Sequence, residues 1–236
     1  MRWFTLPCAV FALAGCVSRP LDEPPAANDG TSSPPTSSPT APLGPTDGNF
    51  RPLPNYPAGP YGAGRGAIIE NHSFLGWRDP VRAGFDPSRL EEVSLSDFYD
   101  PGGSDTELIV VNASAVWCPV CRSEMRTIDT RDLAAAYRDS KVVLLGTLFE
   151  DAALNPAKPA DLALWGNGLN FVVDFPLVLD PGLKLGPYFS DAATPLNLVI
   201  DARTMEILQV YMGYGEGLWA FVNTELARRG IEPPSQ

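Results

Sequence analysis

The sequence has little histidine, little cysteine and no long hydrophobic run, and each shortage excludes a class of protein. It contains one histidine and four cysteines among 236 residues, and only Cys118 and Cys121 lie beyond position 16. A structural zinc site needs about four Cys or His ligands, which this chain cannot assemble from those residues. A c-type haem site needs histidine directly after the second cysteine, and that position is Arg122. We therefore expect no metal and no cofactor.

Basic residues are also scarce. Lys and Arg number 17 against 28 Asp and Glu, which gives a formal net charge of −11. Nucleic-acid binding depends on cations that neutralise phosphate, so this balance argues against a nucleic-acid partner. Hydrophobic residues make up 44% of the chain, which is enough for a folded core.

The first sixteen residues have the pattern of an export signal. Arg2 supplies a positive charge, and the apolar run Trp3–Leu13 is too short to span a membrane comfortably. Residues 13–16, Leu-Ala-Gly-Cys, resemble the lipobox of bacterial lipoproteins. This resemblance implies that residues 1–15 are removed and that Cys16 is lipidated. The alternative is an ordinary signal peptide with a chance cysteine.

A proline-rich stretch follows the proposed lipid site. Twelve of the 25 prolines lie between Pro20 and Pro60, among many Ser and Thr residues. Such a stretch has too little apolar surface to offset the entropy of ordering its backbone. We interpret residues 16–65 as a lipidated cysteine plus a tether, and residues 66–236 as the folded domain. The predicted location is the bacterial cell envelope, with the domain anchored to a membrane and facing the periplasm or exterior.

Hydrophobic patterning in residues 66–236 predicts an α/β fold with a central mixed sheet flanked by helices. Short apolar pieces in residues 67–98 indicate an N-terminal hairpin or cap. The helix at 159–168 falls in an insertion between the second and third core strands, and a short helix is expected near Leu183. The expected strands are 107–113, 141–149, 175–180, 196–201 and 206–212, and the main helices are 119–139, 159–168 and 217–229.

The pair Cys118 and Cys121 is better suited to chemistry than to stability. Closing a loop this small removes little entropy from the unfolded chain, so the disulfide is a weak staple. Cys118 follows a strand and opens a helix, where free backbone N–H groups and the helix dipole favour a thiolate. Thiolate is the attacking species in disulfide exchange, so Cys118 is the predicted nucleophile. Cys121, one turn later, would then resolve the mixed disulfide. An inert structural disulfide is the alternative.

Residues 112–121, Asn-Ala-Ser-Ala-Val-Trp-Cys-Pro-Val-Cys, resemble the active-site segment of thioredoxin-like proteins, in particular the membrane-tethered TlpA/ResA-like branch. The resemblance covers about residues 90–230. It implies a thioredoxin-like fold and thiol–disulfide oxidoreductase activity. Further matching segments are Ser94–Phe98, Phe175–Pro181 and Thr194–Asp201.

The resemblance also implies roles for individual residues. Pro195 would be a cis-proline facing the disulfide, and the backbone near Thr194 would pair with an extended substrate. Glu124 matches an acidic residue that tunes the thiols in the ResA-like branch, and Trp117 would flank the nucleophile. Each role has an alternative. Pro195 could be an ordinary trans proline in a loop, Glu124 a solvated helix residue, and Trp117 an aromatic that only packs. His72 is interpreted as a surface or cap residue.

One position departs from cytoplasmic thioredoxins, which carry a buried Asp six residues before the first cysteine. Here that position is Asn112, which cannot titrate. Proton handling would therefore pass to Glu124 or to water.

The predicted function is reduction of disulfides in exported proteins, with oxidation or isomerisation less favoured. In the tethered branch, electrons commonly arrive from a membrane thiol transporter, which is the implied partner beside the protein substrates. One alternative is a non-enzymatic binding module that keeps the fold. A second is a peroxiredoxin-type peroxidase, which usually has Thr or Ser three residues before its attacking cysteine. Here the residue three positions before Cys118 is Ala115, and the residue three positions before Cys121 is Cys118, so this motif is absent.

Overall fold

The computed structural model describes residues 56–235. The proposed signal and Cys16 lie outside the described residues. The described chain forms seven strands: β1 (Ser73–Trp77), β2 (Glu91–Ser94), β3 (Leu108–Ala115), β4 (Val142–Glu150), β5 (Leu177–Leu179), β6 (Leu196–Asp201) and β7 (Ile207–Met212). The α-helices are α1 (Pro80–Ala83), α2 (Pro119–Thr130), α3 (Leu133–Asp139), α4 (Pro159–Asn167) and α5 (Gly217–Arg228). Short 3-10 helices cover Pro87–Arg89, Leu95–Phe98 and Gly186–Tyr188.

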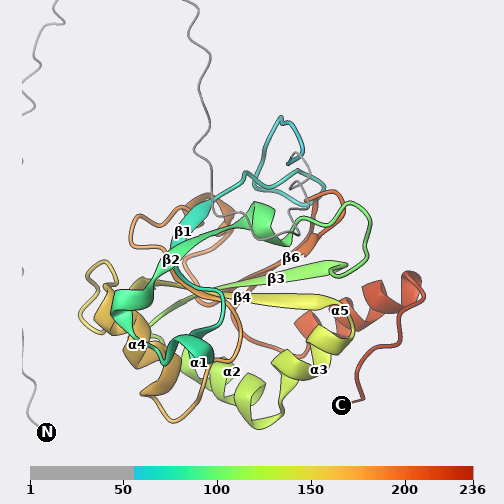
Figure 1. Ribbon diagram of the computed structural model, residues 1–236. Helices are drawn as coiled ribbons and strands as arrows, with labels where there is room; N and C mark the ends of the chain where they lie inside the picture. Colours follow the sequence, from blue (N-terminus) through green and yellow to red (C-terminus); the bar gives the residue numbers. More distant parts are fainter. Residues whose placement is uncertain (1–55, 236) are drawn as a thin grey trace, which may run out of the picture. The chain divides into compact units, whose positions relative to one another are not determined.

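All seven strands join in one sheet, and the sheet is mixed, as predicted. Five of the strands were predicted, and β1 and β2 add to them. The strand order is β2-β1-β5-β4-β3-β6-β7 (Figure 1). β3 pairs in parallel with β4 and antiparallel with β6. Ala115 at the end of β3 is in register with Glu150 at the end of β4. The segments that follow these two strands therefore leave the sheet side by side, at one edge.

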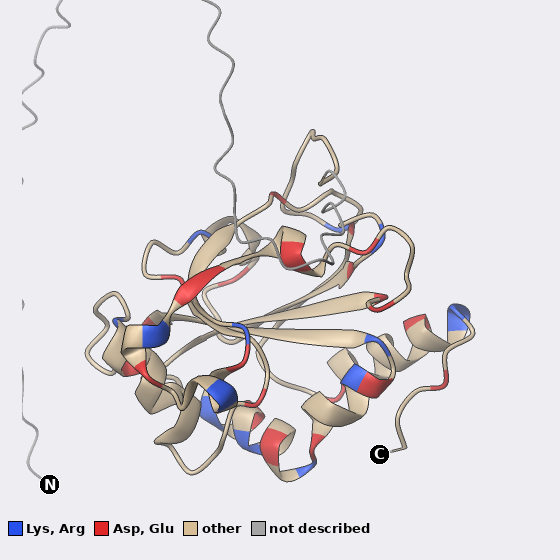
Figure 2. Cartoon of the chain, viewed as in Figure 1, with Lys and Arg blue, Asp and Glu red and all other residues tan. Residues whose placement is uncertain are grey.

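The centre of the sheet is apolar because its strands are covered on both faces. Every residue of β3 is buried, and β4 is buried except at Val143 and at its last residue, Glu150. Strands buried on both faces have nearly continuous hydrophobic sequences, which explains why these two were predicted from sequence. Figure 2 shows the central strands without charge except at their ends, while the helices below them carry both acidic and basic residues.

Helices α3 and α5 pack against each other beside the sheet. The ring of Tyr137 in α3 stacks on Trp219 in α5, with centroids 4.6 Å apart. The hydroxyl of Tyr137 also donates to Oδ1 of Asn223, at 2.8 Å. Helix α4 lies between β4 and β5 in the chain, so the predicted insertion is present.

The single helix predicted over 119–139 is wrong, because the structure divides it into α2 and α3. Arg131 caps the end of α2, and Asp132 has a φ of 50°, in the left-handed region. Asp adopts this conformation more readily than most residues, since its short polar side chain can bond locally. The break starts a separate helix, α3, at Leu133.

The N-terminal hairpin is confirmed, and it belongs to the main sheet. β1 pairs antiparallel with β2 and, on its other side, antiparallel with β5. The helix expected near Leu183 is the 3-10 turn Gly186–Tyr188, and Leu183 itself has a φ of 49°.

The described domain begins before position 66. The hydroxyl of Tyr56 donates to the carbonyl of Ile69 at 2.8 Å, and Tyr61 forms a bridge with Ile68. Residues 56–65 were expected to belong to the tether, whereas the structure gives them contacts with the domain. Those contacts use two tyrosines, which offer apolar surface that the preceding proline-rich sequence lacks.

Candidate active site

Strand β3 delivers the first cysteine to the start of helix α2. The backbone N–H of Cys118 donates to the carbonyl of Ala115, at 3.1 Å. Cys118 then occupies the N-cap of α2, and its Sγ accepts the backbone N–H of Cys121 at 3.0 Å. Pro119 follows at the first helical position, where no N–H is needed. A helix N-terminus thus points a donor at Cys118, as the sequence predicted.

Cys118 and Cys121 form a disulfide, as expected from their spacing. Their Cα atoms are 5.3 Å apart. Cys118 is 2% exposed and Cys121 is 0% exposed, so the first cysteine is the one nearer to solvent. Between them, Pro119 and Val120 are exposed in the first turn of α2.

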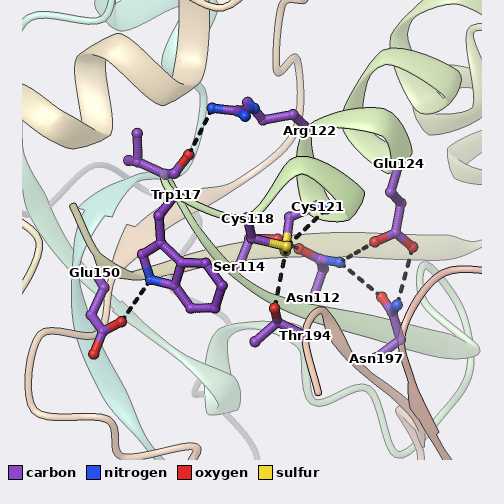
Figure 3. The surroundings of a disulfide bond; sticks show 11 residues. Asn112, Ser114, Trp117, Cys118, Cys121, Arg122, Glu124, Glu150, Thr194 and Asn197 are labelled. Atoms are coloured by element: carbon purple, nitrogen blue, oxygen red, sulfur yellow. Dashed lines mark hydrogen bonds between the residues drawn. A yellow bond between two sulfur atoms is a disulfide. The ribbon is translucent and has the colours of Figure 1, made fainter. Parts of the chain in front are cut away.

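The loop before β6 supplies a second donor to the same sulfur. The hydroxyl of Thr194 donates to Sγ of Cys118 at 3.2 Å (Figure 3). The Thr194–Pro195 peptide bond is cis, so the alternative of a trans proline is wrong. β6 is the antiparallel neighbour of β3, which is why residues 76 positions apart meet here.

Glu124 lies inside the protein, next to the two central strands. It is 0% exposed, so the alternative of a solvated helix residue is wrong. Its Oε2 accepts Nδ2 of Asn112 at 2.8 Å, and its Oε1 accepts Nδ2 of Asn197 at 3.0 Å. Burial raises the pKa of Glu124 to about 8, against the opposing effect of these two hydrogen bonds. This carboxyl therefore titrates near neutral pH.

The two asparagines hold each other as well as the carboxyl. Nδ2 of Asn112 also donates to Oδ1 of Asn197 at 3.0 Å, and Oδ1 of Asn112 accepts the hydroxyl of Ser114 at 2.6 Å. Asn112 and Asn197 stand opposite each other in the β3–β6 register. Neither Asn197 nor Ser114 was predicted as a site residue. The available signal was a polar residue within each of two otherwise apolar strands.

Trp117 is fixed by a carboxylate from the neighbouring strand. Its indole Nε1 donates to Oε2 of Glu150 at 2.7 Å, and its side chain is half-buried. Figure 3 shows the Trp117 indole between the disulfide and Glu150. Glu150 was not predicted as a site residue; it is the polar residue that ends the apolar run of β4.

The comparisons with known proteins agree with this architecture. No protein-family model and no curated protein sequence matches the chain. Among solved structures, a protein described as a thiol:disulfide interchange protein DsbE, from Chlorobium tepidum, aligns with a TM-score of 0.51 and 17% identity over 69% of this chain and 98% of that one. A protein described as a disulfide isomerase, from Bacteroides thetaiotaomicron, aligns with a TM-score of 0.51 and 20% identity over 70% of this chain and 89% of that one.

The chain has a thioredoxin-like fold. A reduced 2-Cys peroxiredoxin from Plasmodium vivax is similar to it as well, with a TM-score of 0.50 and 14% identity over 70% of this chain and 82% of that one. Likeness at these identities establishes the fold alone, because one fold can carry many functions and the site determines which one.

Within this thioredoxin-like fold, the structure brings together all but one of the predicted site residues. Cys118, Thr194 and Trp117 meet at the carboxyl edge of the sheet, and Pro195 follows Thr194. Glu124 lies one helical turn after Cys121. The exception is the proposed lipid site, which lies outside the described residues.

His72 belongs to a different cluster. Its Nε2 lies 3.0 Å from the hydroxyl of Tyr188, and burial lowers its pKa. Within residues 56–235 no group of three or more Cys, His, Asp or Glu side chains is arranged to hold a metal ion. No helix in that range is long and apolar enough to cross a membrane.

Proposed function

We propose that this protein catalyses thiol–disulfide exchange on exported proteins and works as a reductase. The observation that supports this most directly is the environment of Cys118. Its Sγ sits at the N-cap of α2 and accepts hydrogen bonds from the Cys121 amide and the Thr194 hydroxyl. Donors placed in this way stabilise a thiolate once the disulfide is reduced.

Exchange proceeds in two balanced steps. The Cys118 thiolate attacks one sulfur of a substrate disulfide, forms a mixed disulfide and releases the other substrate sulfur as a thiolate. The Cys121 thiolate then attacks Sγ of Cys118, which releases the second substrate sulfur and restores the Cys118–Cys121 disulfide. The substrate gains two electrons, and the two cysteines of the protein lose them.

Glu124 is the proposed proton-handling group for Cys121. A thiol with no exposed surface must lose its proton before it attacks, and Glu124 lies three residues later on the same helical face. A pKa of about 8 allows this carboxyl to gain or release a proton under ordinary conditions. Asn112 and Asn197 orient both of its oxygens.

The location and the source of electrons are part of the proposal. Residues 13–16 resemble a lipobox, and the proline-rich stretch after them suits a tether. These features support a domain anchored to a bacterial membrane through Cys16. A membrane thiol transporter would then supply the electrons that regenerate the reduced pair.

Trapping tests the exchange chemistry. A Cys121→Ser variant should attack a disulfide peptide and stop at a covalent adduct through Cys118, because the resolving sulfur is missing. Intact-mass measurement of the adduct checks this, with the wild type as the control that turns over. Absence of any adduct, together with no reduction by the wild type, would favour the binding module.

The reduction potential of the Cys118–Cys121 disulfide tests the direction of exchange. A value well below roughly −220 mV supports the reducing direction, and one near −120 mV contradicts it.

Removing the Thr194 hydroxyl should make the Cys118 thiolate less stable relative to the thiol. Thr194→Val keeps the shape of the side chain but loses the donor to Sγ of Cys118. We expect alkylation of the reduced protein by iodoacetamide at pH 7 to slow about three- to tenfold, with the pH profile moved upward. Thr130→Val, which removes an exposed hydroxyl from the far end of helix α2, is the control. An unchanged profile in Thr194→Val would contradict the role of this hydrogen bond.

A further inference from the structure

The turn Asp151–Asn155 carries the most exposed large hydrophobic side chain of the described residues. Leu154 is 64% exposed, and its backbone φ is 64°, in the left-handed region. Leucine is unfavourable there on two counts, because its Cβ crowds the backbone and its apolar surface faces water. A position that served only the turn would favour asparagine or glycine. The turn alone therefore does not account for the leucine, and its place in the fold has to be considered.

The turn holds Leu154 in place without help from a ligand. The Asp151 carboxylate accepts the backbone N–H of Ala153 at 2.7 Å and of Asn155 at 2.9 Å. The backbone N–H of Asp151 donates to the carbonyl of Asn155, at 2.8 Å. These contacts to the carboxylate lower the pKa of Asp151, so it stays ionised and the turn stays closed. A side chain presented in this way loses little conformational entropy on binding.

This turn starts at the edge of the sheet where the disulfide lies. It begins directly after Glu150, whose carboxylate holds Trp117 and whose carbonyl accepts the backbone N–H of Val116 at 3.0 Å. β3 and β4 are adjacent parallel strands, about 4.8 Å apart. Val120, between the two cysteines, adds a second apolar side chain that is 45% exposed. Val120 thus adds exposed apolar surface within the disulfide loop itself.

We propose that Leu154 is a specificity-determining residue, which contacts an apolar side chain next to the reacting cysteine of an extended protein substrate. This inference rests on the proposed exchange function. A substrate segment that reaches Cys118 from the Thr194 side continues over the ends of β3 and β4, toward the turn. Both carboxylates there are already engaged, since Asp151 closes the turn and Glu150 binds Trp117. Neither is free to pair with a cation of the substrate, so the contact proposed for Leu154 is an apolar one.

Two disulfide peptides that differ at one position test this inference. They are identical except that the residue beside the cysteine is Leu in one and Asn in the other. The wild type should reduce the Leu peptide faster. Leu154→Asn should slow reduction of the Leu peptide about five- to tenfold and change the Asn peptide less than about twofold. Asparagine suits the left-handed backbone, so the variant should keep its fold, as a thermal melt will show.

Leu183→Asn is the matched control. Leu183 is 42% exposed, has a φ of 49°, and sits in a turn capped by the Asp180 carboxylate. It follows β5, two strands away from β3, so its replacement should leave both rates unchanged. The inference would be overturned if Leu154→Asn slowed reduction of both peptides equally, or slowed neither. If the wild type reduces neither peptide, the exchange function fails; if it reduces both equally, only the preference fails.

Discussion

Replacing Cys118 by serine is expected to abolish disulfide reduction, with a loss of roughly a thousandfold or more. A serine hydroxyl does not ionise near neutral pH and cannot form the mixed disulfide. Cys121 is no substitute, because it has no exposed surface from which its sulfur could reach a substrate disulfide. The measurement is single-turnover reduction of a disulfide peptide by the prereduced protein.

The comparison with Cys121→Ser assigns the two roles. That variant should retain the first attack within several-fold of the wild type, since Cys118 keeps the helix N-terminus and the Thr194 hydroxyl. Reduced wild type should also be alkylated first at Cys118, which peptide mapping identifies. If Cys118→Ser formed the adduct and Cys121→Ser did not, the assigned order of attack would be reversed.

The parts of the fold that could be predicted from sequence are the strands and helices whose own residues show a clear apolar pattern. Apolar runs bounded by turns identified β3, β4 and β6, because strands buried on both faces need continuous hydrophobic sequence. Cys118 and Cys121 were identified because their spacing alone brings the two sulfurs together at a helix start. The break at Asp132 was missed, since the pattern of apolar residues continues across it.

The missed site residues depend on strand pairing that the sequence does not show. Asn197 reaches Asn112 across 85 positions, only because β6 pairs with β3 in a particular register. Glu150 reaches Trp117 across 33 positions for a similar reason, through the β3–β4 pair. Polar residues inside apolar strands mark such positions, but only the register tells which of them meet.

Protein stability is expected to fall as pH rises toward 8, and Glu124 is the cause. Its pKa is about 8 in the folded protein against an ordinary value of 4.5, so between these values the folded state holds a proton that the unfolded chain has released. Stability then decreases with pH, because the folded state binds more protons. Each pKa unit corresponds to about 1.4 kcal/mol, so the full window represents roughly 5 kcal/mol at most.

Glu124→Gln isolates this contribution. The variant cannot titrate at this position, so the difference in unfolding free energy between wild type and variant should decline by about 1.4 kcal/mol per pH unit and level off above about pH 8. Urea unfolding of the oxidised protein from pH 5.5 to 9 measures it, and the disulfide keeps the cysteines from titrating. Burial lowers the pKa of His72 from its ordinary value of 6.5, so below that pH this residue makes stability rise with pH. His72 is present in both proteins, so its effect cancels in the difference.

The control for this experiment is an acidic residue on the same helix. Asp129 is exposed on α2, so Asp129→Asn should give a stability curve parallel to that of the wild type. Parallel curves for Glu124→Gln and wild type would mean that the buried carboxyl is ionised throughout the range. In that case the donors from Asn112 and Asn197 would outweigh its burial, and Glu124 would have no proton to exchange with Cys121 near neutral pH. A declining difference would instead show that this carboxyl holds a proton at the pH where the proposed reduction takes place.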